Sequence, residues 1–527
     1  MKHFFFIIFT FSFLLLAAQH DPIKTEDKFR RALQYMRLNY VDSIDEVKLT
    51  EVAIKKMLEE LDPHSVYMSA DEIKQANEQL KGNFDGIGVQ FQIIRDTINV
   101  IDVISGGPSE TVGIRAGDKI INIDKKNATG KSINNAFVMK NLRGVKGSVV
   151  NVDIKRPSEK ELLEFSITRD KIPIYSVDAS YMLTPKIGYV KINKFGETTM
   201  REFSDAISKL EKSKFESLIL DLRNNGGGYL KTAVELADQF IPKNKVIVYT
   251  EGRNEKRYDY NATSKGSFEK GNLIVLINEG SASASEIVAG AIQDYDRGLV
   301  MGRRSFGKGL VQRPFSFIDG SAMRLTVSRY YTPSGRCIQR PYGDGNEDYY
   351  KELAKRLEHG ELSNQDSIKF PDSLKYKTNA GRIVYGGGGI MPDIFIPMDT
   401  TGYSEYYKKL FRKNVYSIFI ADYVIQHRER LMAEYKNIGE FKANFTIKDD
   451  FRQLFFDEAE KIGVPFDEEG FKQSAKIIET IIRASLARSL YGNESYYEII
   501  SEIDNELLIA VEYLEKNKNF KKYLNNN

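Results

Sequence analysis

The chain has 527 residues, and its 76 basic and 73 acidic side chains leave a formal net charge of only +3 at pH 7. This balance excludes the strongly basic surface of a nucleic-acid-binding protein and gives no signal for binding to a charged membrane surface. A single cysteine, Cys337, excludes an intrachain disulfide and a cysteine-based zinc site. The length predicts several domains with a large core.

The N-terminus has the pattern of a secretory signal peptide. Lys2 precedes an apolar run from Phe4 to Ala18, and a polar stretch follows. The run is shorter than the roughly 20 apolar residues that span a bilayer, which argues against the alternative of an uncleaved anchor. No later stretch is apolar enough to cross a membrane. We therefore expect residues 1–18 to be removed and the remaining chain to be exported to the periplasm or the cell envelope.

Four further segments differ in their hydrophobic pattern. Residues 19–83 repeat apolar side chains at helical spacing. Residues 84–157 contain short alternating runs between turns, which is typical of a compact β-rich module. Over residues 158–400, apolar strands alternate with amphipathic helices, which predicts a buried sheet with crossover connections. Residues 401–527 return to charged, tyrosine-rich helices. We expect a mixed α/β, multidomain protein.

The stretch GRRSFGKGLVQ, residues 302–312, nearly matches a phosphate-binding loop. That loop requires Ser or Thr after its lysine and a helix beyond it. Here Lys308 is followed by Gly309 and by a strand-like segment that contains Pro314. A nucleotide site is therefore disfavoured. Lys308 is either a solvated lysine in a glycine-rich turn or a lysine with a different chemical task.

A cluster of serines, SASAS at residues 281–285, follows a predicted strand and begins a predicted helix. Serines at such a turn are most often helix N-caps, but an exposed one can also be a nucleophile. A serine nucleophile needs a base. None of the five histidines lies between residues 65 and 358, and nothing in the sequence around His64, His359 or His427 suggests that role.

A neutral lysine can replace the missing histidine. Its ordinary pKa of about 10.4 would have to fall to about 7, and burial without a carboxylate partner produces changes of that order. Lys308 has the apolar neighbours Phe306 and Leu310, so a sheltered position is expected. Gln312 would point the same way as Lys308 along a strand or a helix, and it could orient the amine without adding charge.

Two glycine-containing loops are candidates for binding negative charge. Residues 224–228, NNGGG, follow a predicted strand, and their amides could converge on a phosphate or on the oxyanion of a tetrahedral intermediate. The oxyanion fits better beside a nucleophilic serine. Residues 86–89, GIGV, precede another strand. Amides in such a loop can capture the terminal carboxylate of a peptide while the strand edge pairs with it, although the motif is also compatible with an ordinary turn.

Together these segments resemble the carboxy-terminal processing peptidases, also called tail-specific proteases. The family's motifs occur in its order between residues 60 and 397, among them LDPHS, GNFDGIGV, LRGVKG, DLRNNGGG, NEGSASASEIVAGAIQDY and FGKGLVQ. The resemblance implies a PDZ domain over residues 84–157 and an α/β protease core of the ClpP/crotonase-like kind over residues 158–400. It also implies site residues: the nucleophile Ser283, the general base Lys308, the lysine-positioning Gln312, the oxyanion donors Gly227 and Ala284, and the peptide-binding Gly86, Ile87, Gly88 and Val89.

The same resemblance implies a serine endopeptidase whose PDZ domain binds polypeptides with apolar C-termini. It implies no metal and no organic cofactor, and it leaves an adaptor protein and a homo-oligomer open as partners. Because such families often gate their activity, we hypothesise that PDZ movement switches the contact between Ser283 and Lys308. One departure from the family is Gly226, where proline is usual and where glycine loosens the loop.

Two other functions were weighed against this interpretation. A catalytically inactive PDZ scaffold would bind C-terminal peptides without cleaving them, but intact Ser283, Lys308 and Gln312 argue against it. A penicillin-recognising Ser–Lys enzyme carries an SxxK pattern, which occurs here as SFEK at residues 267–270. That match lies in a charged, loop-like stretch without the companion motifs of such enzymes, and it is therefore disfavoured.

Overall fold

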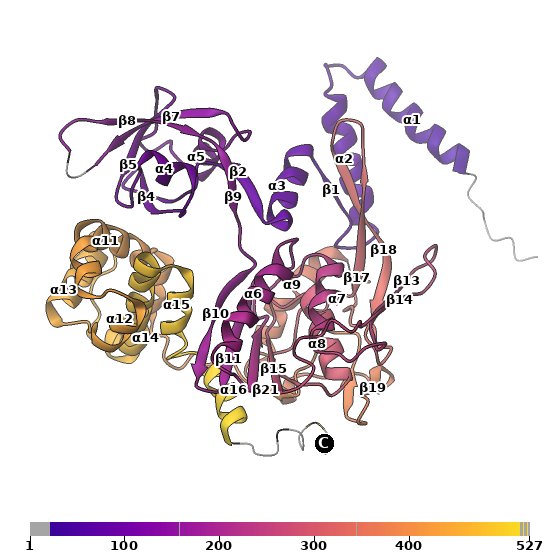
Figure 1. Cartoon of the computed structure of the whole chain (residues 1–527). Helices are drawn as coiled ribbons and strands as arrows, with labels where there is room; N and C mark the ends of the chain where they lie inside the picture. Colours follow the sequence, from indigo (N-terminus) through magenta and orange to yellow (C-terminus); the bar gives the residue numbers. More distant parts are fainter. Residues whose placement is uncertain (1–21, 157–158, 344, 517–519, 521–523, 525–527) are drawn as a thin grey trace, which may run out of the picture.

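The computed structural model describes residues 22–156, 159–343, 345–516, 520 and 524. The expected signal peptide, residues 1–18, lies outside this part of the chain. Among the described residues, no helix combines the length and the hydropathy that crossing a bilayer requires. Four parts follow one another along the chain: N-terminal helices, a β-rich module, an α/β core and a C-terminal helical module (Figure 1). The expected mixed α/β, multidomain architecture is confirmed.

The N-terminal part consists of α1 (Pro22–Asn39), α2 (Glu46–Glu59) and α3 (Ala70–Lys81). Side chains close in the sequence cap the N-termini of two of these helices. Asp45 accepts a hydrogen bond from the third amide of α2, and Ser69 caps α3 in a capping box with Glu72. Helix α1 projects away from the rest of the chain (Figure 1). Between α2 and α3, strand β1 (Val66–Met68) leaves this part and pairs with the core, so the segment is anchored there.

The β-rich module is built on one sheet in the order β3-β4-β5-β7-β8, with β6 beside β5. Its strands are β3 (Val89–Ile94), β4 (Thr97–Val103), β5 (Lys119–Ile123), β6 (Lys126–Asn127), β7 (Val149–Lys155) and β8 (Leu163–Thr168), and its helices are α4 (Pro108–Val112) and α5 (Asn135–Leu142). Strands β2 (Asn83–Gly86) and β9 (Asp170–Pro173), which flank this sheet in the sequence, pair with each other in a separate two-stranded sheet. Since β8 pairs with β7 along its whole length, the module reaches Thr168, beyond the expected boundary at residue 157.

The core contains a central sheet in the order β10-β11-β12-β15-β16-β21, parallel except for β10. Its strands are β10 (Val177–Thr184), β11 (Ile187–Ile192), β12 (Ser217–Asp221), β15 (Asn272–Ile277), β16 (Leu299–Gly302) and β21 (Ile394–Phe395). Alternate residues of these strands face two separate clusters of buried apolar side chains. One is covered by α6 (Thr199–Glu211), α7 (Leu230–Asp238) and α8 (Ala284–Asp294), and the other by α16 (Asn505–Lys516).

A second, antiparallel sheet lies beside the central one and contributes to the same site. It contains β1, β13 (Val246–Glu251), β14 (Tyr258–Asn261), β17 (Leu310–Ser316) and β18 (Ala322–Tyr331). Smaller elements complete the core: α9 (Asn346–Glu358), two 3-10 turns (Gln365–Ser367 and Asp372–Leu374), β19 (Lys375–Lys377) and β20 (Ile383–Tyr385). The strand-like segment after Lys308 is β17, not a helix, so the phosphate-loop interpretation is wrong.

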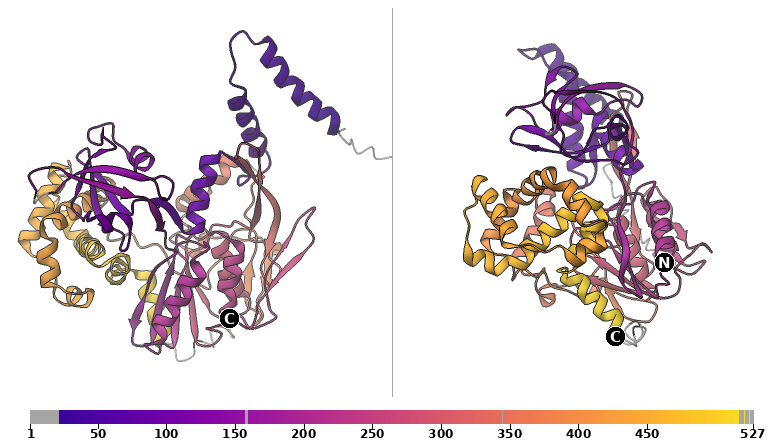
Figure 2. Two further views of the ribbon diagram at one scale, coloured as in Figure 1. Left: turned by 45° about the horizontal axis from the view of Figure 1, so that its top comes forward. Right: turned by 60° about the vertical axis from the view of Figure 1, so that its left-hand side comes forward.

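The C-terminal module has its own aromatic core, in which Phe441 and Phe455 are fully buried. Its helices are α10 (Glu405–Arg412), α11 (Val415–Glu434), α12 (Ile438–Asn444), α13 (Asp449–Lys461), α14 (Glu468–Tyr491) and α15 (Asn493–Ile500). The module lies beside the β-rich module (Figures 1 and 2). There Arg95 pairs with Glu458 at 2.8 Å and with Asp422 at 3.1 Å. The β-rich module is therefore held on two sides, by its chain connections to the core and by these helices.

Candidate active site

Ser283 lies at a strand-to-helix turn, between the end of β15 and the start of α8. The two neighbouring serines of the cluster are buried and donate to backbone carbonyls: Ser281 Oγ to Leu222 at 2.8 Å, and Ser285 Oγ to Asn225 at 2.8 Å. These bonds fasten the turn to the loop after β12. Ser283 itself is only half-buried and has φ 55°, a strained conformation for a residue other than glycine. Of the three serines, Ser283 is thus the one that remains partly accessible.

Lys308 lies in the loop between β16 and β17. Its Nζ donates to Gln312 Oε1 at 3.0 Å, and Gln312 Nε2 donates to the backbone carbonyl of His64. Burial lowers the pKa of Lys308, and the positive charge of Arg324 lowers it further, whereas Asp62 and Glu286 oppose the change. The lysine expected to be sheltered is therefore in surroundings that favour its neutral form, with a neutral partner on its amine.

Sequence reasoning missed Glu286, which joins the segments that carry Ser283 and Lys308. Its fully buried carboxylate accepts bonds from the backbone amides of Ser283 at 2.8 Å, Lys308 at 2.9 Å and Gly307 at 2.7 Å. Burial raises the pKa of Glu286, while these hydrogen bonds act in the opposite direction. The Ser-x-x-Glu spacing of a capping box, Ser283 to Glu286, is the signal in the sequence that could have identified it.

Tyr330 joins the same two segments through their carbonyl groups. The hydroxyl of this buried β18 residue lies 3.1 Å from the carbonyl oxygen of Ser283 and 2.7 Å from that of Lys308. The turn of Ser283 and the loop of Lys308 are therefore connected twice: Glu286 joins their amide groups, and Tyr330 joins their carbonyl groups. No local pattern in the sequence points to Tyr330, because its partners become neighbours only when the second sheet packs against the first.

A histidine does lie near the lysine, contrary to the expectation from the sequence. His64 accepts the bond from Gln312 through its backbone carbonyl, and its ring Nε2 is 2.7 Å from the hydroxyl of Tyr349. Burial, together with the positive charge of Lys308, lowers the pKa of His64 to about 4. Its contribution to the site is a carbonyl group that orients Gln312. The LDPHS motif that carries His64 comes from the N-terminal part, next to β1.

The structure places Gly227 directly against the predicted nucleophile. A Cβ at Gly227, which has φ 102°, would lie 2.9 Å from Ser283 Cβ and 3.0 Å from the amide nitrogen of Ala284, the first residue of α8. The amide of Gly227, however, donates to Asn225 Oδ1 at 2.9 Å. Of the two predicted oxyanion donors, Ala284 stands at a helix N-terminus, and Gly227 would have to share its proton with Asn225 or release that bond.

The four predicted peptide-binding residues form one loop at the start of an edge strand. Gly86 ends β2, Gly88 has φ 77°, and Val89 begins β3. The carbonyls of Ile87 and Gly88 accept bonds from Ser109 and Ile104, which fix the loop. Within the described residues β3 pairs with β4 alone, so its other edge is open to an added strand. This loop belongs to the β-rich module, apart from α8 and the catalytic candidates (Figure 1).

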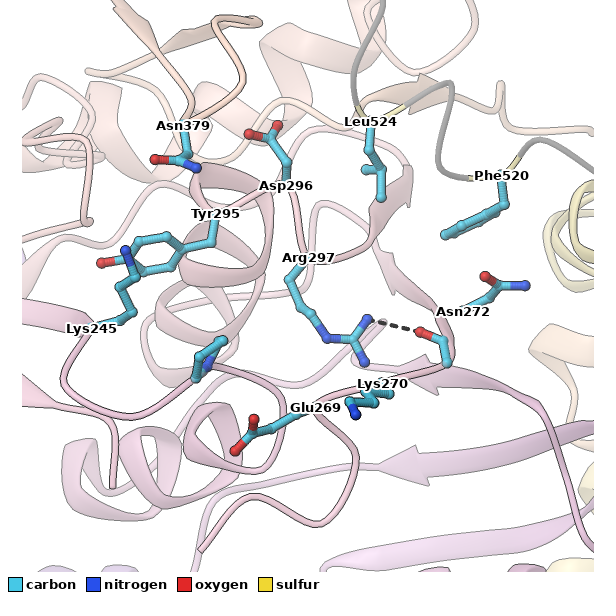
Figure 3. A pocket seen from close by; sticks show the side chains of 12 residues that line it. Lys245, Glu269, Lys270, Asn272, Tyr295, Asp296, Arg297, Asn379, Phe520 and Leu524 are labelled. Carbon is cyan, nitrogen blue, oxygen red and sulfur yellow. Dashed lines mark hydrogen bonds between the residues drawn. The ribbon is translucent and has the colours of Figure 1, made fainter. Parts of the chain in front are cut away.

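The structure also contains a pocket of about 450 Å³, and Figure 3 shows the side chains that line it. Its lining includes Asn272, the first residue of β15, and Arg297, which precedes β16. It therefore opens at the amino ends of the strands, whereas Ser283 follows their carboxyl ends. Lys270 of the SxxK match also lines this pocket, and residues 267–270 are not helical. The pocket and the SFEK segment are thus separate from the site at Ser283.

Comparisons with known proteins agree with this organisation. Family models match residues 186–345 (peptidase family S41), residues 86–168 (PDZ domain) and residues 16–72 (activating protease CtpB N-terminal domain). A fourth, described only as a family of unknown function, matches residues 406–492. The α/β core is therefore the core of a serine-type peptidase, and the β-rich module is a PDZ domain.

Bacterial relatives indicate the family more specifically than these domain matches do. The carboxy-terminal processing protease CtpB of Bacillus subtilis (strain 168) is 38% identical over 328 residues, 61% of this chain and 67% of that protein. The carboxy-terminal-processing protease of Bartonella bacilliformis is also 38% identical, over 61% of this chain and 74% of its own length. A probable CtpA-like serine protease of Staphylococcus aureus (strain N315) is 37% identical, over 59% of this chain and 62% of its own length. The chain belongs to the carboxy-terminal processing protease family.

Proposed function

We propose that this chain is an exported serine endopeptidase that recognises the C-terminal tails of proteins through its PDZ domain and cleaves peptide bonds with a dyad of Ser283 and Lys308. One observation carries the proposal. A half-buried lysine with a lowered pKa, oriented by the neutral Gln312, lies on a segment that Glu286 and Tyr330 tie to the turn of a half-buried, strained serine. These are the requirements of a serine nucleophile activated by lysine.

In the proposed reaction, neutral Lys308 takes the proton from the Ser283 hydroxyl as Oγ attacks the scissile carbonyl. The negative charge on the carbonyl oxygen develops at the N-terminus of α8, where the amide of Ala284 supplies one donor and the amide of the adjacent Gly227 supplies another by sharing or releasing its bond to Asn225. Protonated Lys308 then gives its proton to the leaving amine, which leaves an acyl-enzyme. Water, deprotonated by Lys308, releases the acyl group and restores the serine.

The PDZ domain supplies the proposed tail recognition. A peptide would add to the open edge of β3, and its terminal carboxylate would accept bonds from amides in the loop Gly86–Val89. We further propose that movement of this domain switches the contact between Ser283 and Lys308. Removing the PDZ domain tests the switch: equal cleavage rates with and without it would contradict this part of the proposal.

Export to the periplasm or the cell envelope rests on the N-terminal sequence. Residues 4–18 form the apolar segment of a signal peptide after a basic start. N-terminal sequencing of the protein recovered from a cell-envelope fraction should show cleavage near residue 18. Recovery of the uncleaved chain from the cytosol would contradict export.

The central experiment incubates the mature protein with an unfolded substrate that ends in an apolar tail, and with the same substrate after amidation of its C-terminal carboxylate. Wild type should cleave the free tail and lose most of this activity on the amidated one. Ser283→Ala and Lys308→Ala should both be inactive. Ser267→Ala, in the SFEK segment, is the matched control and should retain full activity.

The outcomes separate the proposal from its alternatives. Tail binding without cleavage by wild type would indicate a PDZ scaffold. Loss of activity in Ser267→Ala with retention in Ser283→Ala would move the nucleophile to the SxxK segment. Equal cleavage by wild type and both dyad variants would refute the mechanism.

A further inference from the structure

Two buried arginines lie at the bases of loops that carry the proposed catalytic groups. Arg223 follows β12 and precedes the glycine loop of Gly227, and Arg303 follows β16 and precedes the loop of Lys308. Their side chains are only 12% and 5% exposed. Because a guanidinium stays charged and cannot be hydrated at such sites, each needs carboxylate partners.

Part of this pairing comes from the core itself. Arg223 bonds to Asp221 at the end of β12, with Nη2 to Oδ2 at 2.6 Å. Arg303 Nε bonds to Glu279 Oε2 at 2.8 Å. Glu279 lies in the turn between β15 and Ser283. Arg303 therefore already connects the loop of the general base with the turn of the nucleophile.

The remaining pairing comes from the other end of the chain, at the start of α16. Asp504 receives Arg223 in a bidentate pair, with Nη1 to Oδ1 at 2.9 Å and Nη2 to Oδ2 at 2.6 Å. Glu506 bonds to both arginines, to Arg223 Nη1 at 3.3 Å and to Arg303 Nη1. Glu506 is thus the one described carboxylate shared by the two arginines, and through Arg303 it reaches the nucleophile turn as well.

We propose that Asp504 and Glu506 are positioning residues for catalysis, and that the start of α16 clamps the glycine loop, the nucleophile turn and the general-base loop in one arrangement. This inference rests on the proposed function of Ser283 and Lys308 and adds a role for the C-terminal end of the chain. Helix α16 has an independent hold on the core, since Leu507 and Ala510 pack on the apolar face of the central sheet. Removing the two charges therefore leaves the helix docked but loosens the loops.

The test variant is Asp504→Asn combined with Glu506→Gln. Both changes keep side-chain shape, and asparagine retains the N-cap bond that Asp504 makes to the amide of Leu507. Glu512→Gln is the matched control, because Glu512 lies on the same helix, is 55% exposed and pairs with Lys516. Circular dichroism checks that every variant is folded.

Three readouts distinguish positioning from general destabilisation. The double variant should show kcat lowered at least about tenfold, since small displacements of catalytic groups have effects of this size or larger. KM and the affinity for a fluorescent apolar tail peptide should be unchanged. The rate at which a sulfonyl fluoride labels Ser283 should fall in parallel with kcat, because labelling also depends on activation of Ser283 by Lys308. This small reagent does not need the PDZ domain, so its labelling rate reports on the catalytic site alone. Glu512→Gln should match wild type in all three.

Wild-type kcat and labelling rate in the folded double variant would overturn the proposal. If the double variant does not fold, the single changes decide: each must lower kcat and labelling by itself, and a folded, fully active Glu506→Gln would overturn it. Failure of the proposed function gives a different result, because Ser283→Ala would then cleave like wild type. Cleavage that depends on Ser283 but is unaffected by the charge removal would refute only the role of Asp504 and Glu506.

Discussion

The substitution Glu286→Gln tests the connection between the proposed nucleophile Ser283 and the proposed general base Lys308. The carboxylate accepts four hydrogen bonds: those from the amides of Ser283, Lys308 and Gly307, and one from the hydroxyl of Ser305. A glutamine has the same shape but presents an NH₂ group at one of the two oxygen positions. In the better orientation that group faces Gly307 and Ser305, so the amide of Gly307 loses its acceptor.

The expected loss of stability follows from these bonds. A buried amide without a partner costs about 1–3 kcal/mol, and the two bonds to Ser283 and Lys308 each weaken by about 1 kcal/mol when the acceptor is neutral. A neutral glutamine costs less to bury than a carboxylate, and this difference offsets part of the loss. We therefore expect the core to lose about 2–4 kcal/mol of its free energy of unfolding, a large part of the roughly 5–15 kcal/mol typical of a domain.

Activity should fall further than stability alone requires. The bond that the amide of Ser283 donates to Glu286 supports the strained φ of 55°, and a displaced nucleophile reduces turnover by about 100-fold or more. The assay is cleavage of a tail-bearing substrate below the unfolding transition, with urea unfolding followed by circular dichroism. Glu235→Gln is the control: this residue is exposed on α7, and its loss should change stability by less than about 0.5 kcal/mol. Cleavage by Glu286→Gln within twofold of wild type would refute the reasoning.

Three further substitutions test the site. Arg324→Gln removes a positive charge that lowers the pKa of Lys308, so the pKa should rise and the rising limb of kcat/KM against pH should move to higher pH; an unmoved limb would contradict the electrostatic argument. Gly227→Ala would place a methyl group 2.9 Å from Ser283 Cβ at φ 102°, so assays should show activity lost by about 100-fold or more, and wild-type turnover would disprove the close approach. Gly226→Pro should retain activity and raise stability by about 0.4–1 kcal/mol in thermal unfolding, since a Cβ there meets no atom within 4 Å and φ is not left-handed; an inactive variant would show that this loop must move.

The sequence predicted much of the fold from local patterns. Strands β11, β12, β15 and β16 are largely apolar runs with helical segments between them, so the alternation itself indicated a buried sheet with crossover connections. Helix α8, which was expected to be amphipathic, is buried along its whole length. The boundary of the PDZ domain was less predictable. Strand β8 is separated from β7 by a polar stretch of sequence, and only its pairing with β7 shows that it belongs to that sheet.

The candidate site divides in the same way. Local features made the serine cluster at a strand-to-helix turn and the lysine among glycines and apolar residues candidates, and the family resemblance then selected Ser283, Lys308 and Gln312. Gly227 could be selected as well, but not the bond from its amide to Asn225, which depends on the conformation of the turn. The backbone contacts of Tyr330 and the carbonyl of His64 required the packing of β18 and of the LDPHS segment against the segments that carry Ser283 and Lys308.

The sequence by itself therefore determined which chemical groups are available: a serine, a lysine, a glutamine and two glycine-containing loops. The tertiary structure decided what those groups experience. The pKa of Lys308 falls because distant segments bury it and bring Arg324 near it, and the loops are held by Glu286 and by carboxylates of α16 at the far end of the chain. Burial, charge and hydrogen bonding between remote residues exist only after the sheets and helices have packed, and no local pattern encodes them.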